Sequence, residues 1–361
     1  MAPRGARALV TSLIAHGREA GTPDAVVARR AVSQFLTEIG YDVQEHAFRF
    51  NAGAYRALPI SGALFAAASL IQVPLLLRPA PTWAPAVAVL ILGALLAMVT
   101  LGVVRGDGGP ACSRMDGNLI ASRPGSTVRC WLVAHLDTKA QAQSMAGRLW
   151  TVWVTSIALG GVIAIAVVRL LGGAVPAAVA LASTALGVLG GILLTGGRLA
   201  GSSPGARDNG SGLLAVLTAA ELSADGSIGV VITGAEEFGL VGARALVRDC
   251  PSLFREATVL NVDTVDDAGT LFVVTHDRKS GALAGRVLER LAGLSPVSRE
   301  RRLPLGIMVD SVPLSLVARE TVTVGRLNWA TLKRIHTPRD DANGYPLATA
   351  EQVGERLALR I

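Results

Sequence analysis

The sequence is poor in cysteine, in aromatic residues and in charge. Of its 361 residues only 17% are charged and 4% aromatic, and three are cysteines, Cys112, Cys130 and Cys250. An odd number of widely spaced cysteines without a CxxC pair argues against a disulfide framework or a thiolate zinc site and favours a reducing compartment. Scattered basic residues and few aromatic side chains argue against nucleic-acid binding, despite a formal net charge of +7.

A continuous apolar run is also missing from the N-terminal segment. Met1 to Gly21 is only weakly apolar and is interrupted by Arg4, Arg7 and Arg18. We therefore expect no cleaved signal peptide.

Aliphatic residues are in excess instead. Hydrophobic residues make up 51% of the chain, a composition that favours a membrane protein. Four uncharged apolar runs are each long enough to cross about 30 Å of hydrocarbon: Ala57 to Leu77, Trp83 to Val104, Leu149 to Val168 and Ala174 to Thr195. Short linkers join them in pairs, so we predict two transmembrane hairpins, at residues 51–106 and 148–197. The alternative is that these runs are buried helices of a soluble core.

The segments outside the hairpins alternate between short apolar strands and helices. Each hairpin returns the chain to its starting side, so residues 1–50, 107–147 and 198–361 can join in one domain. A helix from Thr22 to Gly40 and a strand from Tyr41 to Phe50 are expected. Further strands are expected at Asn118 to Ser122, Val128 to His135, Ile228 to Thr233, Thr258 to Asp263, Leu271 to Thr275 and Thr321 to Val324. Further helices are expected at Gly212 to Leu222, Leu240 to Arg248, Gly281 to Leu291, Ser311 to Arg319 and Glu351 to Arg360.

This alternation predicts an α/β fold. The expected architecture is a three-layer α/β/α sandwich with a mostly parallel mixed sheet, in addition to the four transmembrane helices. Ligands of such folds gather at the carboxyl ends of the strands.

Acidic and imidazole side chains follow the apolar strands. His135 and Asp137 lie at one strand end, where the two-residue alternation points both side chains the same way. Asp208 lies in a glycine-rich loop that enters a helix, Gly205 to Gly212. The loop lacks the Lys-Ser/Thr ending of a phosphate-binding loop, and an acid would repel phosphate, so a metal-bridging Asp208 is the better explanation.

Three further positions carry the same kinds of side chain. Glu236 and Glu237 follow another strand, and adjacent carboxylates repel unless a cation or a proton compensates, which fits one metal ligand and one general base. A solvated helix start is the alternative for this pair. Asp263 ends a buried strand, and His336 lies near the C-terminus. None of these motifs is specific alone.

In their order along the chain, the motifs resemble those of the M28 family of zinc peptidases. The family order is HxD, GAxDNxSG, EExGLxG, an aspartate that ends a strand, and HTPxD. All five occur here, as His135-Leu136-Asp137, Gly205 to Gly212, Glu236 to Gly242, Asp263, and His336 to Asp340. The resemblance covers Thr22 to Phe50, Asn118 to Asp137 and Gly205 to the C-terminus, and both hairpins fall outside it.

The resemblance implies a site for two zinc ions per chain. His135 and Asp263 would hold one ion. Glu237 and His336 would hold the other, and Asp208 would bridge the two ions. Asp137 would orient His135, and Glu236 would be the general base. A hydroxide shared by the two metals would attack the peptide carbonyl, and nitrogen and oxygen ligands suit zinc. The expected function is that of an aminopeptidase acting on peptides at the membrane surface.

Two activities of related proteins are alternatives. Glutaminyl cyclases keep the fold with one zinc, and non-catalytic members act as interaction modules. The intact HxD and DNxSG signatures disfavour the cyclase, and the complete ligand set disfavours the interaction module. The segment Val309-Asp310-Ser311 departs from the family's SDH stretch, which affects the substrate pocket and not the metal ligands.

Charge near the hairpins predicts the side on which the domain lies. Positive residues near short loops are retained in the cytoplasm. The hairpin tips carry only Arg78 and Arg169, whereas the membrane ends on the domain side have Arg49, Arg56, Arg105, Arg114, Lys139, Arg148, Arg198 and Arg207. We therefore expect a multi-pass membrane protein with a cytoplasmic catalytic domain, and peptides and the lipid bilayer as its partners.

Overall fold

A mixed β-sheet forms the centre of the molecule. The computed structural model describes residues 5–77, 87, 91, 93–94, 113–295, 297–300 and 303–359. Within these residues the sheet has eight strands, in the order β1-β2-β4-β3-β5-β8-β6-β7. The strands are β1 (Asp42–Asn51), β2 (Ser113–Ser122), β3 (Cys130–His135), β4 (Ile228–Thr233), β5 (Thr258–Val265), β6 (Thr270–Thr275), β7 (Val297–Glu300) and β8 (Glu320–Leu327).

The middle of the sheet is parallel. β3 pairs in parallel with β4 and with β5, and β5 pairs in parallel with β8. Every residue of β3 and β4 is buried, as expected for strands that are covered on both faces. Antiparallel pairs join β1 to β2, β2 to β4 and β6 to β8. The predicted α/β fold with a mixed sheet is confirmed.

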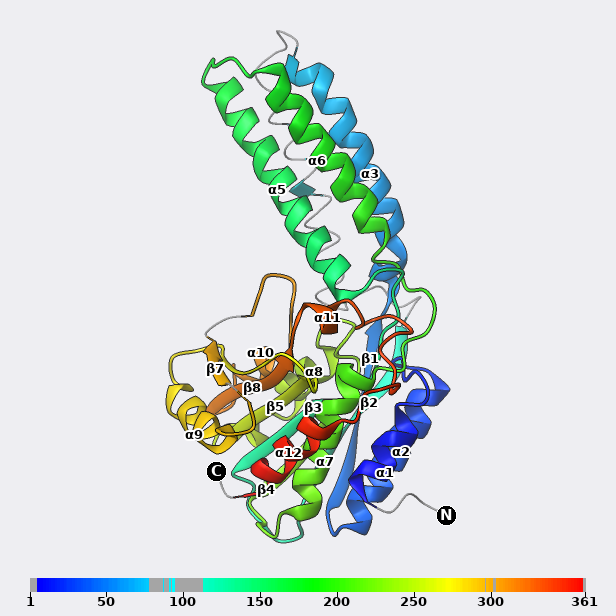
Figure 1. The fold of residues 1–361 in the computed structure, drawn as a ribbon, viewed down its shortest axis with the longest axis vertical. Helices are drawn as coiled ribbons and strands as arrows, with labels where there is room; N and C mark the ends of the chain where they lie inside the picture. The colour runs from blue at the N-terminus through cyan, green and yellow to red at the C-terminus, as the bar shows by residue number, and fades with distance from the viewer. Residues whose placement is uncertain are drawn as a thin grey trace.

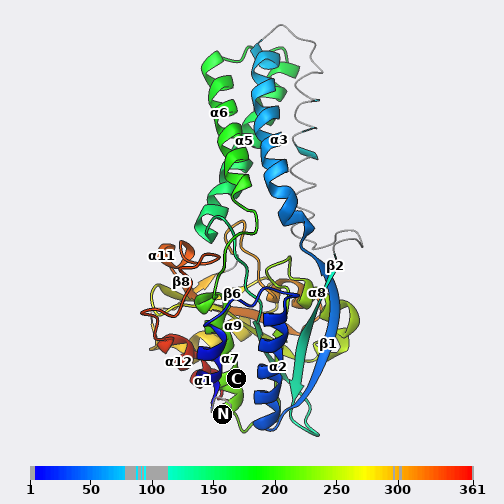
Figure 2. The same cartoon turned by 90° about the vertical axis from the view of Figure 1, so that its right-hand side faces the viewer.

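Helices cover both faces of the sheet (Figures 1 and 2). Leu132 and Val230 point to one face, where their cluster includes residues from α1 (Ala6–Leu13), α2 (Pro23–Glu38), α7 (Gly212–Leu222), α9 (Gly281–Leu291) and α12 (Ala348–Leu357). The adjacent residues Trp131 and Val231 point to the other face and pack with α8 (Val241–Asp249) and α10 (Ser311–Leu314). Neighbouring strand residues thus contact opposite helical layers, as the two-residue period requires.

Some elements differ from the expectation. β7 was not predicted because its residues are polar and only half-buried or exposed, as at a sheet edge. The short helices α1 and α11 (Trp329–Leu332) were also not predicted. The helix expected from Ser311 to Arg319 ends at Leu314 and continues as turns. In contrast, α2 begins as predicted, since Thr22 caps it by accepting a hydrogen bond from Ala25 N.

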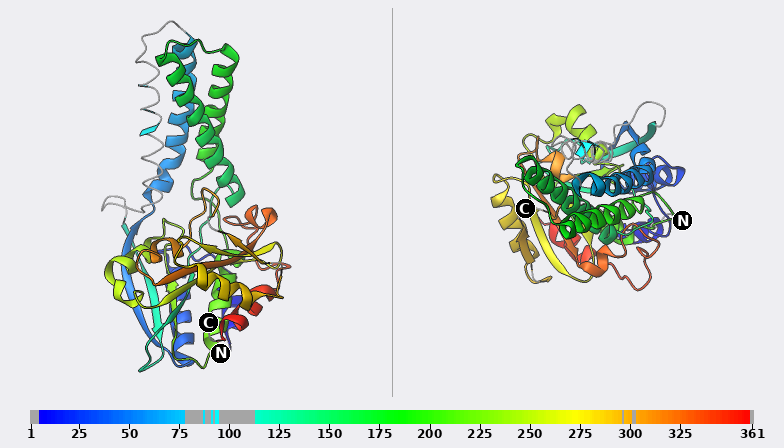
Figure 3. Two further views of the ribbon diagram at one scale, coloured as in Figure 1. Left: turned by 90° about the vertical axis from the view of Figure 1, so that its left-hand side faces the viewer. Right: turned by 90° about the horizontal axis from the view of Figure 1, so that it is seen from above.

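Three long apolar helices project from one end of the sheet domain (Figures 1 and 3). They are α3 (Gly53–Leu77), α5 (Met145–Leu170) and α6 (Ala177–Thr195). α3 and α6 approach closely at two glycines: a Cβ built on Gly62 would lie 2.5 Å from the carbonyl oxygen of Gly191, and the reverse distance is also 2.5 Å. Small residues allow such close contact between apolar helices.

The prediction of four membrane helices is only partly matched. Within the described residues, α5 and α6 are the two helices long and apolar enough to cross a membrane. α5 contains the predicted run Leu149 to Val168, and α6 contains the predicted run Ala174 to Thr195 except for its first three residues. The run Ala57 to Leu77 lies in α3, whose apolar stretch Tyr55–Ile71 is shorter than that criterion. The run Trp83 to Val104 lies outside the described residues.

Candidate metal centre

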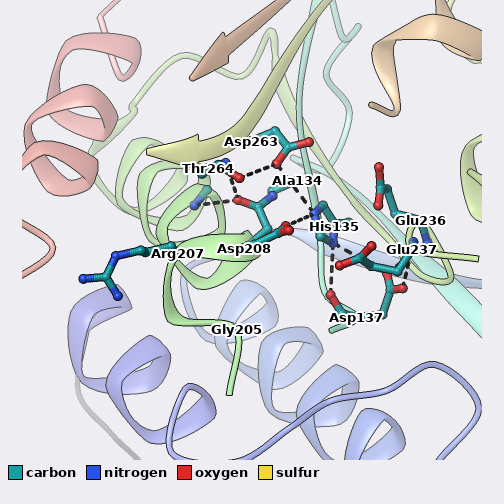
Figure 4. A network of polar contacts seen from close by, with 12 residues as sticks. Ala134, His135, Asp137, Gly205, Arg207, Asp208, Glu236, Glu237, Asp263 and Thr264 are labelled. Atoms are coloured by element: carbon teal, nitrogen blue, oxygen red, sulfur yellow. Dashed lines mark hydrogen bonds and ion pairs between the residues drawn. The ribbon is translucent and has the colours of Figure 1, made fainter. Parts of the chain in front are cut away.

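The five candidate metal ligands come from separate strands, turns and loops and meet at one end of the sheet. His135 ends β3, Glu237 follows β4, Asp263 lies in β5, Asp208 lies in the π-helical turn η2 (Ala206–Ser211), and His336 follows α11. Ligand atoms of His135, Asp208 and Asp263 all lie within 4.8 Å of one another, and so do those of Asp208, Glu237 and His336. The structure therefore brings together every predicted ligand, in two groups that share Asp208. Figure 4 shows the first group, His135, Asp208 and Asp263.

Asp208 directs one carboxylate oxygen at each group. Its Oδ1 lies 3.1 Å from His135 Nε2, and its Oδ2 lies 3.6 Å from His336 Nε2. Within the groups, Asp263 Oδ1 is 3.7 Å from His135 Nε2, and Glu237 Oε1 is 3.0 Å from His336 Nε2. This is the arrangement that a bridging carboxylate requires. The assignment of these residues as ligands stays a prediction.

Asp137 contacts His135 through its main chain. His135 Nδ1 lies 3.0 Å from the carbonyl oxygen of Asp137 and 3.7 Å from its carboxylate. A hydrogen bond from Nδ1 leaves Nε2 free to face Asp208. The Asp137 carboxylate instead accepts hydrogen bonds from the backbone N–H groups of Glu236 and Glu237. Asp137 is thus placed to hold the end of β3, at His135, next to the residues that follow β4, Glu236 and Glu237.

The Asp208 loop is fixed from two sides. The Asp340 carboxylate accepts hydrogen bonds from the N–H groups of Arg207 and Asp208, at 2.9 and 3.1 Å. The Asn209 side chain donates to the carbonyl of Val262 and accepts from Thr264 N. Because Val262 and Thr264 flank Asp263, these bonds hold two candidate ligands in register.

His336 has an unusual backbone conformation. Its φ is 68°, in the left-handed region that few non-glycine residues adopt. The backbone is held there in part by Gln141, whose N–H donates to the His336 carbonyl at 3.0 Å. Residues kept in this region by their surroundings often belong to functional sites.

The buried acids make the centre strongly attractive to cations. Burial raises the pKa of Glu236 well above its usual range and, with the charge of Glu237, raises the pKa of Asp208 to about 6. Burial lowers the pKa of His135, but the surrounding carboxylates, Glu236 first, outweigh burial and raise it well above its usual value. The cluster therefore takes up a proton where it lacks another cation.

The donor set fits zinc. Two imidazoles and three carboxylates supply nitrogen and oxygen ligands, which zinc accepts. Glu237 Oε1 is buried and has no hydrogen-bond partner in the described chain, although it faces His336 Nε2. A buried carboxylate oxygen without a partner is costly, and a metal ion at this point would remove that cost.

Lys139 is a site residue that sequence reasoning missed. Its fully buried ammonium donates to Glu237 Oε2 at 2.7 Å and to the Glu237 carbonyl at 3.1 Å. It also lies 5.2 Å from the centroid of the Tyr55 ring. Burial raises the pKa of Glu237, but His336 and Lys139 outweigh burial and hold that pKa well below its usual range. The only signal was the position of Lys139, two residues after Asp137.

Arg18 is the second missed residue. Its buried guanidinium donates to the carbonyls of Leu136 and Gly205, at 3.0 and 3.1 Å. These carbonyls belong to the HxD segment and to the Asp208 loop, so Arg18 joins two parts of the centre. Burial lowers its pKa to about 10, a value that still leaves the guanidinium charged.

Asp310 gives a pH-dependent stability that can be measured. It is buried, Thr233 Oγ1 donates to its Oδ2, and burial raises its pKa from 3.8 to about 7. A carboxyl whose folded-state pKa is raised stabilises the fold fully below its unfolded pKa and loses that contribution as the pH rises through the folded value. In zinc-free protein, Asp310→Asn should therefore gain about 3 kcal/mol of stability over the wild type between about pH 5 and about pH 7. Urea unfolding of both proteins measures this difference, and parallel pH profiles would contradict it.

Comparisons with known structures agree with this fold. The structure of the aminopeptidase from Aneurinibacillus sp. strain AM-1 has 14% identity and a TM-score of 0.56, with 98% of this chain and 91% of that chain covered. A glutaminyl cyclase from Porphyromonas gingivalis has 16% identity and a TM-score of 0.59, with 98% and 95% covered. A Zn-dependent exopeptidase from Parabacteroides distasonis has 13% identity and a TM-score of 0.56, with 98% and 95% covered. At these identities the likeness establishes the fold.

Sequence comparison adds one family. No curated protein sequence matches the chain. The model of Peptidase family M28 matches residues 187–360, a range that contains Asp208, Glu236, Glu237, Asp263 and His336. His135 and Asp137 lie before it and join the centre through the fold. The C-terminal part of the chain thus matches the M28 family model, and the whole chain has the fold of the compared structures.

Proposed function

We propose that the protein is a two-zinc aminopeptidase whose catalytic domain is anchored in a membrane. The observation that carries the proposal is the pair of donor groups sharing Asp208, with the carboxylate of Glu236 beside them in neither group. His135 and Asp263 would hold one zinc, Glu237 and His336 the other. Bound zinc would act as a Lewis acid that polarises a carbonyl and makes water more acidic.

The residues of the chain supply the proton chemistry. Glu236 lines the cavity at the centre and is buried, with a pKa raised well above the usual value by burial. A carboxyl with a raised pKa can accept a proton from the attacking water and deliver it to the leaving amine. Its backbone is fixed by the hydrogen bond from Glu236 N to Asp137, so the carboxyl stays beside the metal ligands.

The two donor groups favour the peptidase over a glutaminyl cyclase. A cyclase of this fold needs one zinc, whereas both groups are complete here. A measured content of one zinc per chain would favour the cyclase, and loss of all zinc binding would favour an interaction module. The choice of aminopeptidase over other peptidases follows the resemblance in sequence.

Exposure of the long helices supports the membrane anchor. The apolar windows of α5 and α6 are only 33% and 28% buried, whereas the core helix of a globular domain is mostly buried. Exposed aliphatic residues continue along these helices, among them Ile157 at 61% and Ile192 at 59%. Exposed apolar surface of this extent is a hallmark of contact with lipid or another apolar phase.

Charge supports a cytoplasmic position for the domain. Three basic residues near the membrane ends form ion pairs inside the domain: Arg114 with Glu19, Lys139 with Glu237, and Arg207 with Asp266. Even without these three, the sequence has five basic residues near the membrane ends and two in the hairpin tips, Arg78 and Arg169. The count therefore favours the domain in the cytoplasm.

Labelling of single cysteines tests this orientation. After replacement of Cys112, Cys130 and Cys250, a cysteine at Leu171 should react with a membrane-impermeant maleimide added to intact cells. Leu171 is 82% exposed at the far end of α5. A cysteine at Glu355 in the domain should react only after lysis. The opposite pattern would place the domain outside the cytoplasm.

A substrate panel tests the activity. The purified protein should hydrolyse amino-acid amides and unblocked peptides, lose this activity with a chelator and regain it with zinc. N-terminally blocked peptides should resist hydrolysis. Cleavage of blocked peptides instead would indicate an endopeptidase or carboxypeptidase, and cyclisation of N-terminal glutamine alone would indicate a cyclase.

A further inference from the structure

One cavity connects the metal centre to the base of α5. Its volume is about 540 Å³, and Asp208, Glu236, Glu237 and Asp263 lie along one side. The other side is mainly apolar and is formed by three segments: the start of α5, the loop of residues 303–308 and the helix α11. The lining residues are Met145, Leu149 and Trp153 in α5, Leu303, Pro304, Ile307 and Met308 in the loop, and Trp329 and Leu332 in α11. The first turns of an apolar helix thus form part of the wall.

Tryptophans gather at this part of the wall. Trp150 contacts Trp153 with ring centroids 5.6 Å apart and Trp329 with centroids 6.5 Å apart. Trp150 and Trp329 remain 52% and 40% exposed. Tryptophan, with an apolar ring and one N–H, is enriched where a membrane meets water. The contact brings α11 of the sheet domain level with the base of α5.

The loop of residues 303–308 rises beside the same part of α5 (Figure 1). Gly306 has a φ of 104°, and a Cβ built on it would lie 3.1 Å from Leu149 Cδ2. The loop is therefore packed against α5 at a position where glycine is needed. The preceding residue, Leu305, is 67% exposed and is not among the residues that line the cavity.

The cavity wall and the exposed apolar surface belong to one helix. Leu149 lines the cavity, and Ile157 is 61% exposed. Eight residues of helix correspond to roughly 12 Å along the axis. If α5 enters a bilayer, Trp150, Trp329 and Leu305 lie near the surface of that bilayer. The cavity then lies next to this surface, on the side of the sheet domain.

We propose that the mouth of this cavity opens at the bilayer surface and that the enzyme takes peptides held in the bilayer by an apolar segment. This inference rests on the proposed peptidase activity and membrane anchor. An anchored peptide would present its free N-terminal residues along the apolar wall to the acids of the metal centre. The rim formed by Trp150, Trp329 and Leu305 would contact the lipid.

Two peptides with one N-terminal sequence test the inference. One peptide is soluble, and the other continues into an apolar segment of about 20 residues, long enough to span a bilayer. The full-length protein is reconstituted with either peptide in phosphatidylcholine vesicles containing zinc. We expect kcat/KM for the anchored peptide to exceed that for the soluble peptide by at least about tenfold, because anchoring raises the local substrate concentration.

Leu305→Asp should separate the rim from the catalytic centre. Hydrolysis of the anchored peptide should fall about tenfold, since a charge replaces an apolar side chain at the lipid surface. Hydrolysis of the soluble peptide should not change. Leu316→Asp is the matched control, because Leu316 is also exposed, at 78%. Leu316 lies before the start of β8, whereas Trp329 of the rim lies after the end of that strand, so the two residues are at opposite ends of β8. This control should leave both reactions unchanged.

Fluorescence gives a readout that is independent of turnover. Lipids brominated near the headgroup should quench tryptophan emission of the reconstituted protein, and Trp150→Phe with Trp329→Phe should reduce that quenching. Equal rates on the two peptides, equal losses in Leu305→Asp, or unquenched tryptophans would overturn the inference while leaving the peptidase intact. Failure to cleave either peptide would remove the proposed function and this inference with it.

Discussion

Replacement of Glu236 by glutamine should lower kcat by about 10²–10⁴ while both metals remain bound, because a general acid–base group typically contributes that much. Glutamine keeps the shape of the side chain but cannot carry the proton. Glu236 belongs to neither donor group, so the substitution removes no candidate metal ligand. The measurement is turnover of an unblocked peptide, together with zinc content by elemental analysis.

A matched variant distinguishes this role from a general effect of losing an acid. Glu355→Gln changes an exposed glutamate of α12 and should leave both turnover and zinc content unchanged. Loss of zinc in Glu236→Gln would reverse the roles of Glu236 and Glu237. Full turnover in Glu236→Gln would exclude it as the proton carrier.

Replacement of Asp208 by alanine should weaken both metal positions at once. One oxygen of Asp208 faces His135 and the other faces His336, so a single substitution removes a ligand from each group. The loss in affinity should exceed the roughly 10–100-fold that follows removal of an outer-shell partner. Zinc binding measured by titration with a competing chelator gives both affinities.

The comparison with Asp249→Ala makes the result specific. Asp249 is paired with Arg248 and His46 at the surface. The Asp249→Ala variant should therefore bind two zinc ions, as the wild type does. Retention of two tightly held ions in Asp208→Ala would exclude a bridging role. Loss of one ion only would assign Asp208 to a single position.

Local signals made much of the domain predictable. α7 and α9 have the predicted bounds, and β4 does as well, because an apolar run bounded by glycine or polar residues fits one element only. Three candidate ligands, His135, Glu237 and Asp263, lie at or just after the ends of parallel strands, so the sequence already indicated that they meet at one edge of the sheet. Asp208 and His336 are more than a hundred residues apart in sequence, yet they face each other across the centre.

The missed residues act over long separations. Arg18 bonds to Gly205 across 187 positions, and Lys139 bonds to Glu237 across 98. Neither lies in an amphipathic pattern that would show its burial, so Lys139 was counted among the basic residues near the membrane. A buried cation becomes visible only when the partners that satisfy it are in place. The Trp150–Trp329 contact likewise depends on the tertiary fold.

The most direct test is to measure how many zinc ions per chain the activity requires. Metal-free protein is titrated with zinc while bound metal and hydrolysis of an unblocked peptide are measured on the same samples. We expect binding to saturate at about two ions per chain, as a two-metal site requires, with full activity only at saturation. Saturation at one ion with full activity, or activity that persists without metal, would contradict a centre in which Asp208 joins two zinc sites.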